Sequence, residues 1–324
     1  MNEQQIEGIM IYNSISDINN SKTFLCLEKF AEGNDVYLKI EGFNAAGSIK
    51  LKTAISMVQG LEEHGLIKPH CHSLIESSSG NLGVALSIIC ASRGYGFTCV
   101  VDPNASEHCV KLIRLYGGKI IRVFEKDENG GYLSARINKI QEVIEKHPDF
   151  VWTNQYANHD NPMAHYHTTA PEILEEFEKV DYLFVGSSTT GTLVGCCKYF
   201  SEHSPETRLF SVEPEGSVTF GASPATRLLP GLGASRIPEL ASQSCHHNCI
   251  YVSELDSIRT CRLLLEKYSL FAGASTGTVL AAVQQYLKAI RDPGVVVAIS
   301  PDLGDKYIDN LYCPEWVYEN YQEK

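Results

Sequence analysis

Apolar and polar positions along the chain alternate between two patterns. Short apolar or period-two runs, which favour strands, are separated by longer runs with apolar residues three and four positions apart, which favour helices. Glycine or proline marks many of the junctions. The pattern predicts strands at residues 36–40, 73–76, 97–102, 119–124, 182–185, 208–213 and 295–299, and helices at residues 48–64, 81–93, 107–116, 132–146, 190–202, 254–269 and 275–290.

This alternation predicts an α/β fold, in which parallel strands form sheets with helices on both faces. The 324 residues are enough for two such units, and the boundary falls near residues 151–156. We therefore expect two doubly wound domains, residues 1–154 and 155–324, facing each other across a cleft. Whether the N-terminal strands pack on the second domain is left open.

Composition and charge narrow the possible partners. The formal net charge is −12 and no long block of lysine or arginine occurs, which argues against nucleic acid or an anionic membrane as a partner. No apolar run approaches the length of a membrane span, and the first residues lack the pattern of a signal peptide. We therefore expect a soluble, cytoplasmic protein.

The chain has eleven cysteines, which are candidate metal ligands. Most lie in apolar segments and no Cys-x-x-Cys pair occurs, which is typical of a reducing compartment. The segment Cys-His-His-Asn-Cys at 245–249 offers zinc-type ligands, but it stands without a second ligand pair at finger-like spacing. We expect a surface loop there and no metal site.

Two strings in the first half carry the candidate chemistry. Lys50 ends the string Asn-Ala-Ala-Gly-Ser-Ile-Lys at the start of a predicted helix, where burial and the helix dipole favour a neutral, nucleophilic amine. Residues 78–83, Ser-Ser-Gly-Asn-Leu-Gly, form a polar turn that suits an anion or a planar ligand. Together they indicate pyridoxal phosphate chemistry, although a single helical lysine is more often a solvated surface group.

Two strand-to-helix turns follow in the second half. Residues 187–192, Ser-Ser-Thr-Thr-Gly-Thr, combine hydroxyls with the amides of a helix N-terminus, and this exceeds what a plain helix cap needs. We expect them to bind phosphate, because open α/β sheets bind ligands at the carboxyl ends of their strands. For residues 273–278, Gly-Ala-Ser-Thr-Gly-Thr, a cap and a binding site are equally consistent.

These strings, in this order, resemble the fold-type II pyridoxal phosphate enzymes, the cysteine synthase and cystathionine β-synthase family. Lys50 matches the family's Schiff-base lysine, and residues 78–83 match its Thr-Ser-Gly-Asn-Thr-Gly substrate loop. Residues 188–192 match its phosphate loop, Ser275 its serine at the pyridine nitrogen, and residues 230–234 its substrate-lining glycines. The resemblance covers most of the chain. It implies a tryptophan synthase β-subunit-like fold, pyridoxal 5′-phosphate in the cleft between the domains, and a homodimer.

The resemblance implies roles for individual residues. Lys50 is the catalytic residue, which takes the Cα proton and returns it, and the cofactor-binding residues are Lys50, Asn81, Ser188, Thr189, Thr190, Gly191, Thr192 and Ser275. The residues expected to bind the amino-acid substrates are Ser78, Ser79, Asn81, Leu82, Gln155, Arg136, Tyr156, Ser188, Ser235 and Arg236. Arg136 and Arg236 are candidate ligands of the second substrate. A nucleophile with a second carboxylate needs a cation, and arginine binds carboxylates in a bidentate manner. An exposed surface position is the alternative for each.

Within this family the chain is most similar to the siderophore-pathway enzymes that make N-(2-amino-2-carboxyethyl)-L-glutamate. Shared strings lie at residues 79–83, 130–133, 154–158, 188–191 and 233–236. This resemblance implies a β-replacement through an aminoacrylate intermediate, in which O-phospho-L-serine and L-glutamate give phosphate and a precursor of 2,3-diaminopropionate. Small amino acids are then its only expected partners besides a second copy of the chain.

Three departures from the family pattern bear on this expectation. Ala45 replaces a motif proline, and Leu51-Lys52 replace an Asp-Arg pair that is common after the lysine. Leu82 replaces a threonine that helps to hold the substrate carboxylate in cysteine synthases, which argues against sulfide as the nucleophile. The alternatives are a cysteine synthase that uses O-acetylserine or O-phosphoserine with sulfide, and a non-catalytic scaffold or binding protein.

Overall fold

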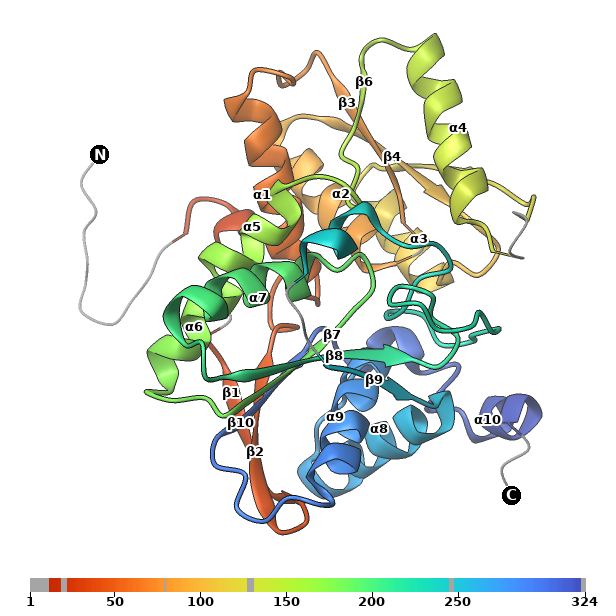
Figure 1. Ribbon diagram of the computed structural model, residues 1–324. Coiled ribbons are helices and arrows are strands. Elements are labelled where there is room, and N and C mark those ends of the chain that lie inside the picture. Colours follow the sequence, from red (N-terminus) through yellow and green to blue (C-terminus); the bar gives the residue numbers. More distant parts are fainter. Residues whose placement is uncertain (1–11, 19–21, 79, 127–130, 245–247, 322–324) are drawn as a thin grey trace.

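The computed structural model describes residues 12–18, 22–78, 80–126, 131–244 and 248–321. Its strands form two sheets, which lie in separate lobes with helices around each (Figure 1). The predicted α/β architecture with doubly wound parallel sheets is confirmed.

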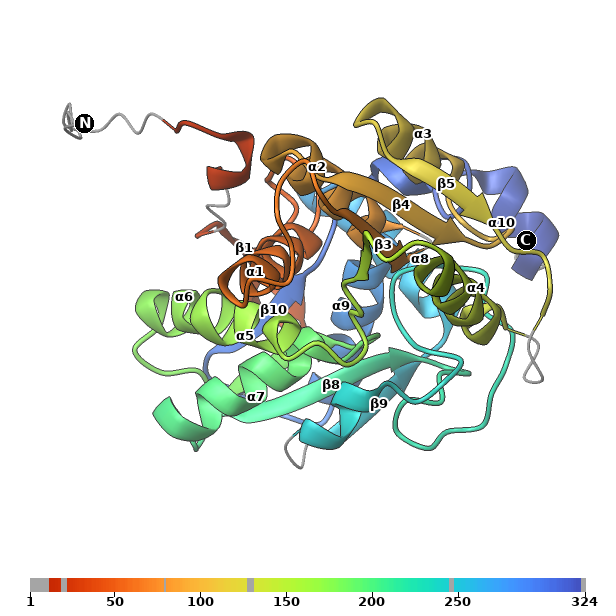
Figure 2. The ribbon, with the colours of Figure 1, turned by 90° about the horizontal axis from the view of Figure 1, so that it is seen from above.

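The smaller sheet has four parallel strands in the order β5-β4-β3-β6. Their bounds are β3 (Ser73–Ser77), β4 (Gly96–Val101), β5 (Lys119–Arg122) and β6 (Phe150–Trp152). One face, with Leu74 and Cys99, packs on α1 (Lys50–Glu63), α2 (Asn81–Arg93) and α3 (Glu107–Leu115). The other face, with Ile75 and Val100, packs on α4 (Leu133–Lys146), so α1 and α4 lie on opposite sides of β3 and β4 (Figure 2).

The larger sheet has six strands in the order β1-β2-β10-β7-β8-β9, and only β1 runs antiparallel to its neighbour. Their bounds are β1 (Phe24–Ala31), β2 (Asn34–Ile40), β7 (Tyr182–Gly186), β8 (Arg208–Pro214), β9 (Asn248–Val252) and β10 (Val296–Ser300). Val296 and Ala298 face α8 (Glu254–Tyr268) and α9 (Ala274–Leu287). Val297 and Ile299 face α6 (Thr169–Glu176) and α7 (Gly191–His203).

The first two strands belong to the sheet that is otherwise built from the second half of the chain. β2 pairs in parallel with β10, with Tyr37 opposite Val297 and Ile40 opposite Ser300. The chain therefore crosses to the other lobe after β2 and returns after β6. α5 (Asp160–His167) packs on both α1 and α7 after this return. The domain limits 1–154 and 155–324 stay a prediction.

Each expected strand and helix has a counterpart in the structure, with ends that differ by a few residues. The pattern did not predict β1, β6, β9, α5, α6, α10 (Pro314–Tyr321) or the 3-10 turns η1 (Ile15–Asp17), η2 (Glu239–Gln243) and η3 (Gly304–Tyr307). These elements are short or carry mixed polarity, so their periodicity is weak. Of the segment expected to be a surface loop at 245–249, residues 245–247 lie outside the described residues, and Asn248 and Cys249 begin β9.

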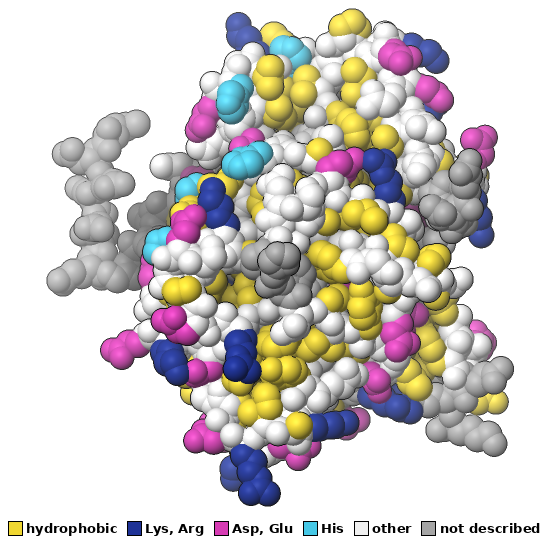
Figure 3. All heavy atoms as spheres, in the orientation of Figure 1, with side chains coloured by type: hydrophobic (Ala, Val, Ile, Leu, Met, Phe, Trp, Pro, Cys, Tyr) yellow, Lys and Arg dark blue, Asp and Glu magenta, His cyan; other side chains and the backbone are white. Residues whose placement is uncertain are grey.

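On the face shown in Figure 3, basic side chains are interspersed with acidic and hydrophobic ones. Within the described parts of the chain, no helix has the length and apolar character that crossing a membrane requires.

Candidate active site

A pocket lies where the N-terminal ends of α1, α2, α7 and α9 converge. Protein atoms leave about 490 Å³ of space there, part of it open to solvent. Four helix N-termini also direct their partial positive charge toward it, which favours an anionic ligand. The residues expected to bind the cofactor all line this pocket: Lys50, Asn81, Ser188, Thr189, Thr190, Gly191, Thr192 and Ser275.

The turn before Lys50 is held by one asparagine. Nδ2 of Asn44 donates hydrogen bonds of 2.9 Å to the carbonyl oxygens of Glu41 and Ser48. Gly47 adopts a φ of +63°, which favours glycine and lets the chain reverse. Lys50 follows as the first residue of α1, so this local structure places its side chain at the pocket.

The environment of Lys50 makes its amine a candidate base and nucleophile. Burial lowers the pKa of Lys50 to about 8, while the nearby carboxylate of Asp302 acts in the opposite direction. A lysine with this pKa is neutral to a useful extent near neutral pH, whereas an ordinary surface lysine is not.

The loop at 188–192 joins β7 to α7 and has the donor groups that a phosphate needs. Within the described chain, no side chain caps the start of α7, so its first amide N–H groups are open to a ligand. Thr190 adopts a φ of +67° at this start. A Cβ atom at Gly191 would overlap with Oδ1 of Asn161, so only glycine permits this close packing. Oγ of Ser188 donates a 3.2 Å hydrogen bond to the carbonyl oxygen of Gly233.

Ser275 lies in the first turn of α9 and is 2 % exposed. Gly231, with a φ of +119°, passes so close that a Cβ atom there would overlap with Oγ of Ser275. The glycine-rich loop at 230–234 therefore packs directly on the serine side of the pocket. The segment before α9 is not a strand, because Ala272 forms only an isolated bridge to Leu303.

Ser78 and Gln155, two residues expected to bind a substrate carboxylate, make hydrogen bonds at the start of α2 and at the end of β3. Oγ of Ser78 accepts hydrogen bonds from the N–H groups of Gly80 and Gly83, at 3.3 and 3.1 Å. Nε2 of Gln155 donates a 2.7 Å bond to the carbonyl oxygen of Ser77. Leu82 packs in the hydrophobic core and does not line the pocket. Ser79 lies outside the described residues.

The two candidate arginines have different environments. Arg136 on α4 is 8 % exposed and its Nε atom lies 3.3 Å from Oδ2 of Asp102. Burial raises the pKa of Tyr156 and the charge of Arg136 opposes this, so the two side chains are close enough to interact. Arg236, next to the half-buried Ser235, is exposed and forms a surface ion pair with Glu239 at 2.6 Å.

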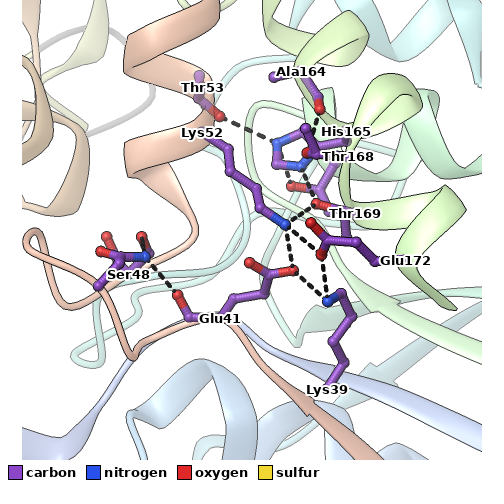
Figure 4. Close-up of polar contacts among 12 residues, drawn as sticks. Lys39, Glu41, Ser48, Lys52, Thr53, Ala164, His165, Thr168, Thr169 and Glu172 are labelled. Carbon is purple, nitrogen blue, oxygen red and sulfur yellow. Dashed lines mark hydrogen bonds and ion pairs between the residues drawn. The ribbon is translucent and has the colours of Figure 1, made fainter. Parts of the chain in front are cut away.

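A buried cluster of four charged residues lies next to the site and was not predicted (Figure 4). Nζ of Lys52 lies 3.0 Å from Oε1 of Glu41 and 2.8 Å from Oε2 of Glu172. Nζ of Lys39 lies 3.3 and 2.6 Å from the same two oxygens, so opposite charges alternate. Lys39 and Glu41 are fully buried. The sequence around Lys39 at the end of β2 and Glu41 just after it does not reveal that Glu172, 133 residues from Lys39, completes the cluster.

His165 is fully buried, and its ring nitrogens lie against three threonine hydroxyls. Nε2 lies 3.1 Å from Oγ1 of Thr53 on α1 and 3.2 Å from Oγ1 of Thr192 on α7, and Nδ1 lies 3.0 Å from Oγ1 of Thr169. Burial lowers the pKa of His165 well below its usual value, and the positive charge of Lys50 acts in the same direction. A neutral ring thus links the two helices that carry the lysine and the phosphate loop.

Asp302 and Lys306 are further residues that sequence reasoning missed. Asp302 follows β10 and is fully buried, and its Oδ2 atom lies 3.2 Å from Nζ of Lys306. The position of Asp302 just after a predicted strand, where ligands bind in α/β sheets, was the signal that could have found it.

The residues present fit pyridoxal phosphate. A lysine of lowered pKa, an uncapped helix start with hydroxyl groups, and a buried serine surround one pocket, as the aldehyde, the phosphate and the ring nitrogen of this cofactor require. In the described residues, no group of three or more His, Cys, Asp or Glu could hold a metal ion.

Comparisons with known proteins agree with this fit. A family model described as "Pyridoxal-phosphate dependent enzyme" matches residues 23–302. The structure is similar to that of an O-acetylserine dependent cystathionine beta-synthase from Helicobacter pylori, with a TM-score of 0.87 and 27% identity over 94% of this chain and 100% of that one.

Two other solved structures are similar over nearly their whole length. An O-ureido-L-serine synthase is 31% identical with a TM-score of 0.85, over 97% of this chain and 98% of that one. A hydrogen sulfide-producing enzyme from Fusobacterium nucleatum is 31% identical with a TM-score of 0.83, over 92% of this chain and 100% of that one.

Proposed function

We propose that this chain, which belongs to the family of pyridoxal-phosphate-dependent enzymes, joins O-phospho-L-serine to L-glutamate. The bond between Cβ and the phosphate oxygen of phosphoserine breaks, and a bond forms between Cβ and the amine nitrogen of glutamate. Inorganic phosphate and N-(2-amino-2-carboxyethyl)-L-glutamate, a precursor of 2,3-diaminopropionate in siderophore biosynthesis, are the products.

Each part of the pocket has a role in this reaction. The bound cofactor supplies an aldehyde that joins to amines and a ring that withdraws electrons from the substrate's Cα. Nζ of Lys50 takes the Cα proton and later returns it, for which its lowered pKa is suited. The amides of α7 and the hydroxyls of the 188–192 loop hold the cofactor phosphate. Ser275 offers the ring nitrogen a neutral hydroxyl, which favours elimination over transamination.

The choice of glutamate as the nucleophile rests on the burial and hydrogen bonding of Arg136. Arg136 is 8 % exposed and its Nε pairs with Asp102 at 3.3 Å, whereas Nη1, among the described residues, has no hydrogen-bond partner. A buried guanidinium donor without an acceptor is costly, and a substrate carboxylate would satisfy Nη1 of Arg136. The charge of Arg136 acts on Tyr156, which follows Gln155 in the expected carboxylate-binding region. A nucleophile with an additional carboxylate therefore suits this side of the site better than sulfide does.

A cysteine synthase activity is the second candidate. It is supported by the likeness to the O-acetylserine dependent enzyme and to the hydrogen sulfide-producing enzyme. Sulfide has no oxygen that could accept a hydrogen bond from Nη1 of Arg136.

Mass spectrometry of the products distinguishes the candidates. The holoenzyme is incubated with O-phospho-L-serine or O-acetyl-L-serine, and each is offered L-glutamate or sulfide. We expect the glutamate adduct from O-phospho-L-serine as the main product. Cysteine as the only product would contradict it.

Two arginine variants test the glutamate site. Arg136→Ala should raise the KM for glutamate by about tenfold or more, because a charged hydrogen-bonded contact is worth about 1.5–3 kcal/mol. Arg236→Ala removes an exposed pair with Glu239 and serves as the matched control, with an expected change below twofold. An unchanged KM for glutamate in Arg136→Ala would refute this assignment.

We also propose that the chain forms a homodimer in the cytoplasm and that its domain boundary lies at 154/155, with β1 and β2 packed on the second domain. Sedimentation equilibrium should give twice the mass of one chain, and a monomer at micromolar concentration would contradict the dimer.

A further inference from the structure

The side chain of Asn81, which lines the pocket, forms hydrogen bonds with residues of the opposite lobe. Asn81 begins α2 in the lobe of the smaller sheet, whereas Asp302 and Lys306 follow β10 of the larger sheet. Nδ2 of Asn81 donates a 2.9 Å hydrogen bond to Oδ2 of Asp302. Oδ1 of Asn81 accepts a hydrogen bond from Nζ of Lys306. Both ends of the Asn81 amide are therefore engaged by residues of the other lobe.

The position of Asp302 is itself tightly fixed. Oδ2 of Asp302 also accepts a 2.9 Å hydrogen bond from the hydroxyl of Tyr307. Its backbone carbonyl accepts a 3.0 Å bond from the N–H of Gly273, just before α9, and its backbone forms a bridge with Ser48, just before α1. A Cβ atom at Gly273 would overlap with Oδ1 of Asp302, so the carboxylate fills the space that this glycine leaves. Asp302 thus stands between the helix starts that carry Lys50 and Ser275.

The chemistry of the two partners determines how the Asn81 amide is turned. An ionised carboxylate only accepts hydrogen bonds and an ammonium only donates them, whereas an amide has a donor end and an acceptor end. Asp302 therefore holds the NH₂ end and Lys306 holds the carbonyl end. Only one of the two hydrogens on Nδ2 is used by Asp302, and Asn81 lines the pocket.

We propose that Asp302 and Lys306 are positioning residues that make Asn81 present an N–H donor, rather than its carbonyl oxygen, to the pocket. The inference rests on the proposed function, because the ligand is taken to be pyridoxal phosphate. The ionised hydroxyl oxygen attached to its pyridine ring carries negative charge and needs a hydrogen-bond donor. A reversed amide would direct an acceptor at that oxygen and repel it. Lys306 does not line the pocket, so its effect passes through Asn81.

The test titrates cofactor-free protein with pyridoxal phosphate and records the dissociation constant and the absorption maximum of the bound cofactor. The variants are Asn81→Ala, Asp302→Asn, Lys306→Met and Lys306→Arg. Lys179→Met, which removes a lysine from an exposed pair with Asp181, is the matched control. Thermal unfolding of each cofactor-free variant reports whether the fold is retained.

We expect Asn81→Ala and Lys306→Met each to weaken cofactor binding by about tenfold and to shift the absorption maximum in the same direction, because each removes a charge-assisted or oriented hydrogen bond. Lys306→Arg retains a donor and should stay within about twofold of the parent, as should Lys179→Met. Asp302→Asn should weaken binding as well, because an amide no longer imposes one orientation.

Two results would overturn the inference. One is a Lys306→Met variant whose affinity and absorption maximum match the parent while Asn81→Ala is altered. The other is an Asn81→Ala variant with no change. A Lys306→Met variant that loses thermal stability but keeps the affinity and absorption maximum of the parent would also overturn the inference. The readout uses no substrate, so absence of the glutamate adduct would refute the proposed reaction and leave this inference standing.

Discussion

Lys52 of α1 and Glu172 of α6 form a buried ion pair, with 2.8 Å between Nζ and Oε2. Helix positions two apart point about 200° from each other, so Lys52 points away from the pocket that Lys50 faces. Burial alone would raise the pKa of Glu172, but the ammonium groups of Lys52 and Lys39 hold it below its ordinary value. The helix that carries Lys50 is thereby tied to a helix on the larger sheet.

We predict that Lys52→Met is strongly destabilising. It leaves Glu41 with one fewer cation in a buried site where, among the described residues, Oε2 already has no hydrogen-bond partner. Removing one partner from a buried charge cluster costs about 3–5 kcal/mol. Urea unfolding of the cofactor-free protein measures this. Lys139→Met, in an exposed pair with Glu142, is the control, and its free energy of unfolding should change by less than about 0.5 kcal/mol. Equal effects of the two substitutions would contradict the prediction.

Lys50→Ala is expected to abolish turnover and the absorption band of the covalently bound cofactor, because no other lysine lines the pocket within the described chain. Circular dichroism should show a folded protein, since the substitution removes a charge from a buried position. Retention of the band in Lys50→Ala would assign the bond to another amine.

The pKa of Lys50 makes stability depend on pH. Its pKa in the folded protein is about 8, below its ordinary value of 10.5, so the unfolded chain binds more protons between these values. Stability should therefore rise with pH from about 8 to 10.5, and the cost of burying the ammonium should be largest below pH 8. This cost is at most on the order of 3 kcal/mol.

Comparison of the cofactor-free parent with Lys50→Met tests this pH dependence, because other titrating groups cancel in the difference. We expect Lys50→Met to be more stable than the parent at pH 7 and the gap to narrow by pH 10. Urea unfolding at several pH values gives the difference. A gap that does not vary with pH would show that the amine is not buried as the structure indicates.

Gly231→Ala should weaken both folding and cofactor binding. The residue has a φ of +119° and a Cβ atom would overlap with Oγ of Ser275, so backbone strain and a displaced serine combine. Gly221→Ala is the matched control, because Gly221 also has a positive φ, +88°, but no atom lies within 4 Å of its added Cβ. The control should lose about 1–2 kcal/mol of stability and keep its affinity for pyridoxal phosphate. Similar cofactor affinity in both variants would rule out a contribution of the close approach.

Local patterns were sufficient for much of the fold and for the pocket's lining. The helices and strands around Lys50, the 188–192 loop and Ser275 are long, periodic and punctuated by glycine, so their type can be read from neighbouring residues alone. The sequence pattern did not predict the short strands β6 and β9 or the helix α5, because their stability comes from partners distant in sequence.

Side-chain partners across the lobes could not be read in the same way. Nothing near Asn81 in the sequence indicates that Asp302 and Lys306 hold its amide, and nothing near Lys52 indicates Glu172. Arg136 and Arg236 looked alike as candidates, but burial beside Asp102 and exposure beside Glu239 separate them.

The sequence by itself therefore determined the α/β alternation, the order of the motifs and the residue types that a pyridoxal phosphate site requires. These depend on periodicity and on turn chemistry, which act over a few neighbouring residues. Only the tertiary structure decided that β1 and β2 join the larger sheet, that four helix starts meet at one pocket, and which charges are buried together. Those relationships arise from packing between segments far apart in the chain, because burial and electrostatic pairing depend on distance in space and not on distance in sequence.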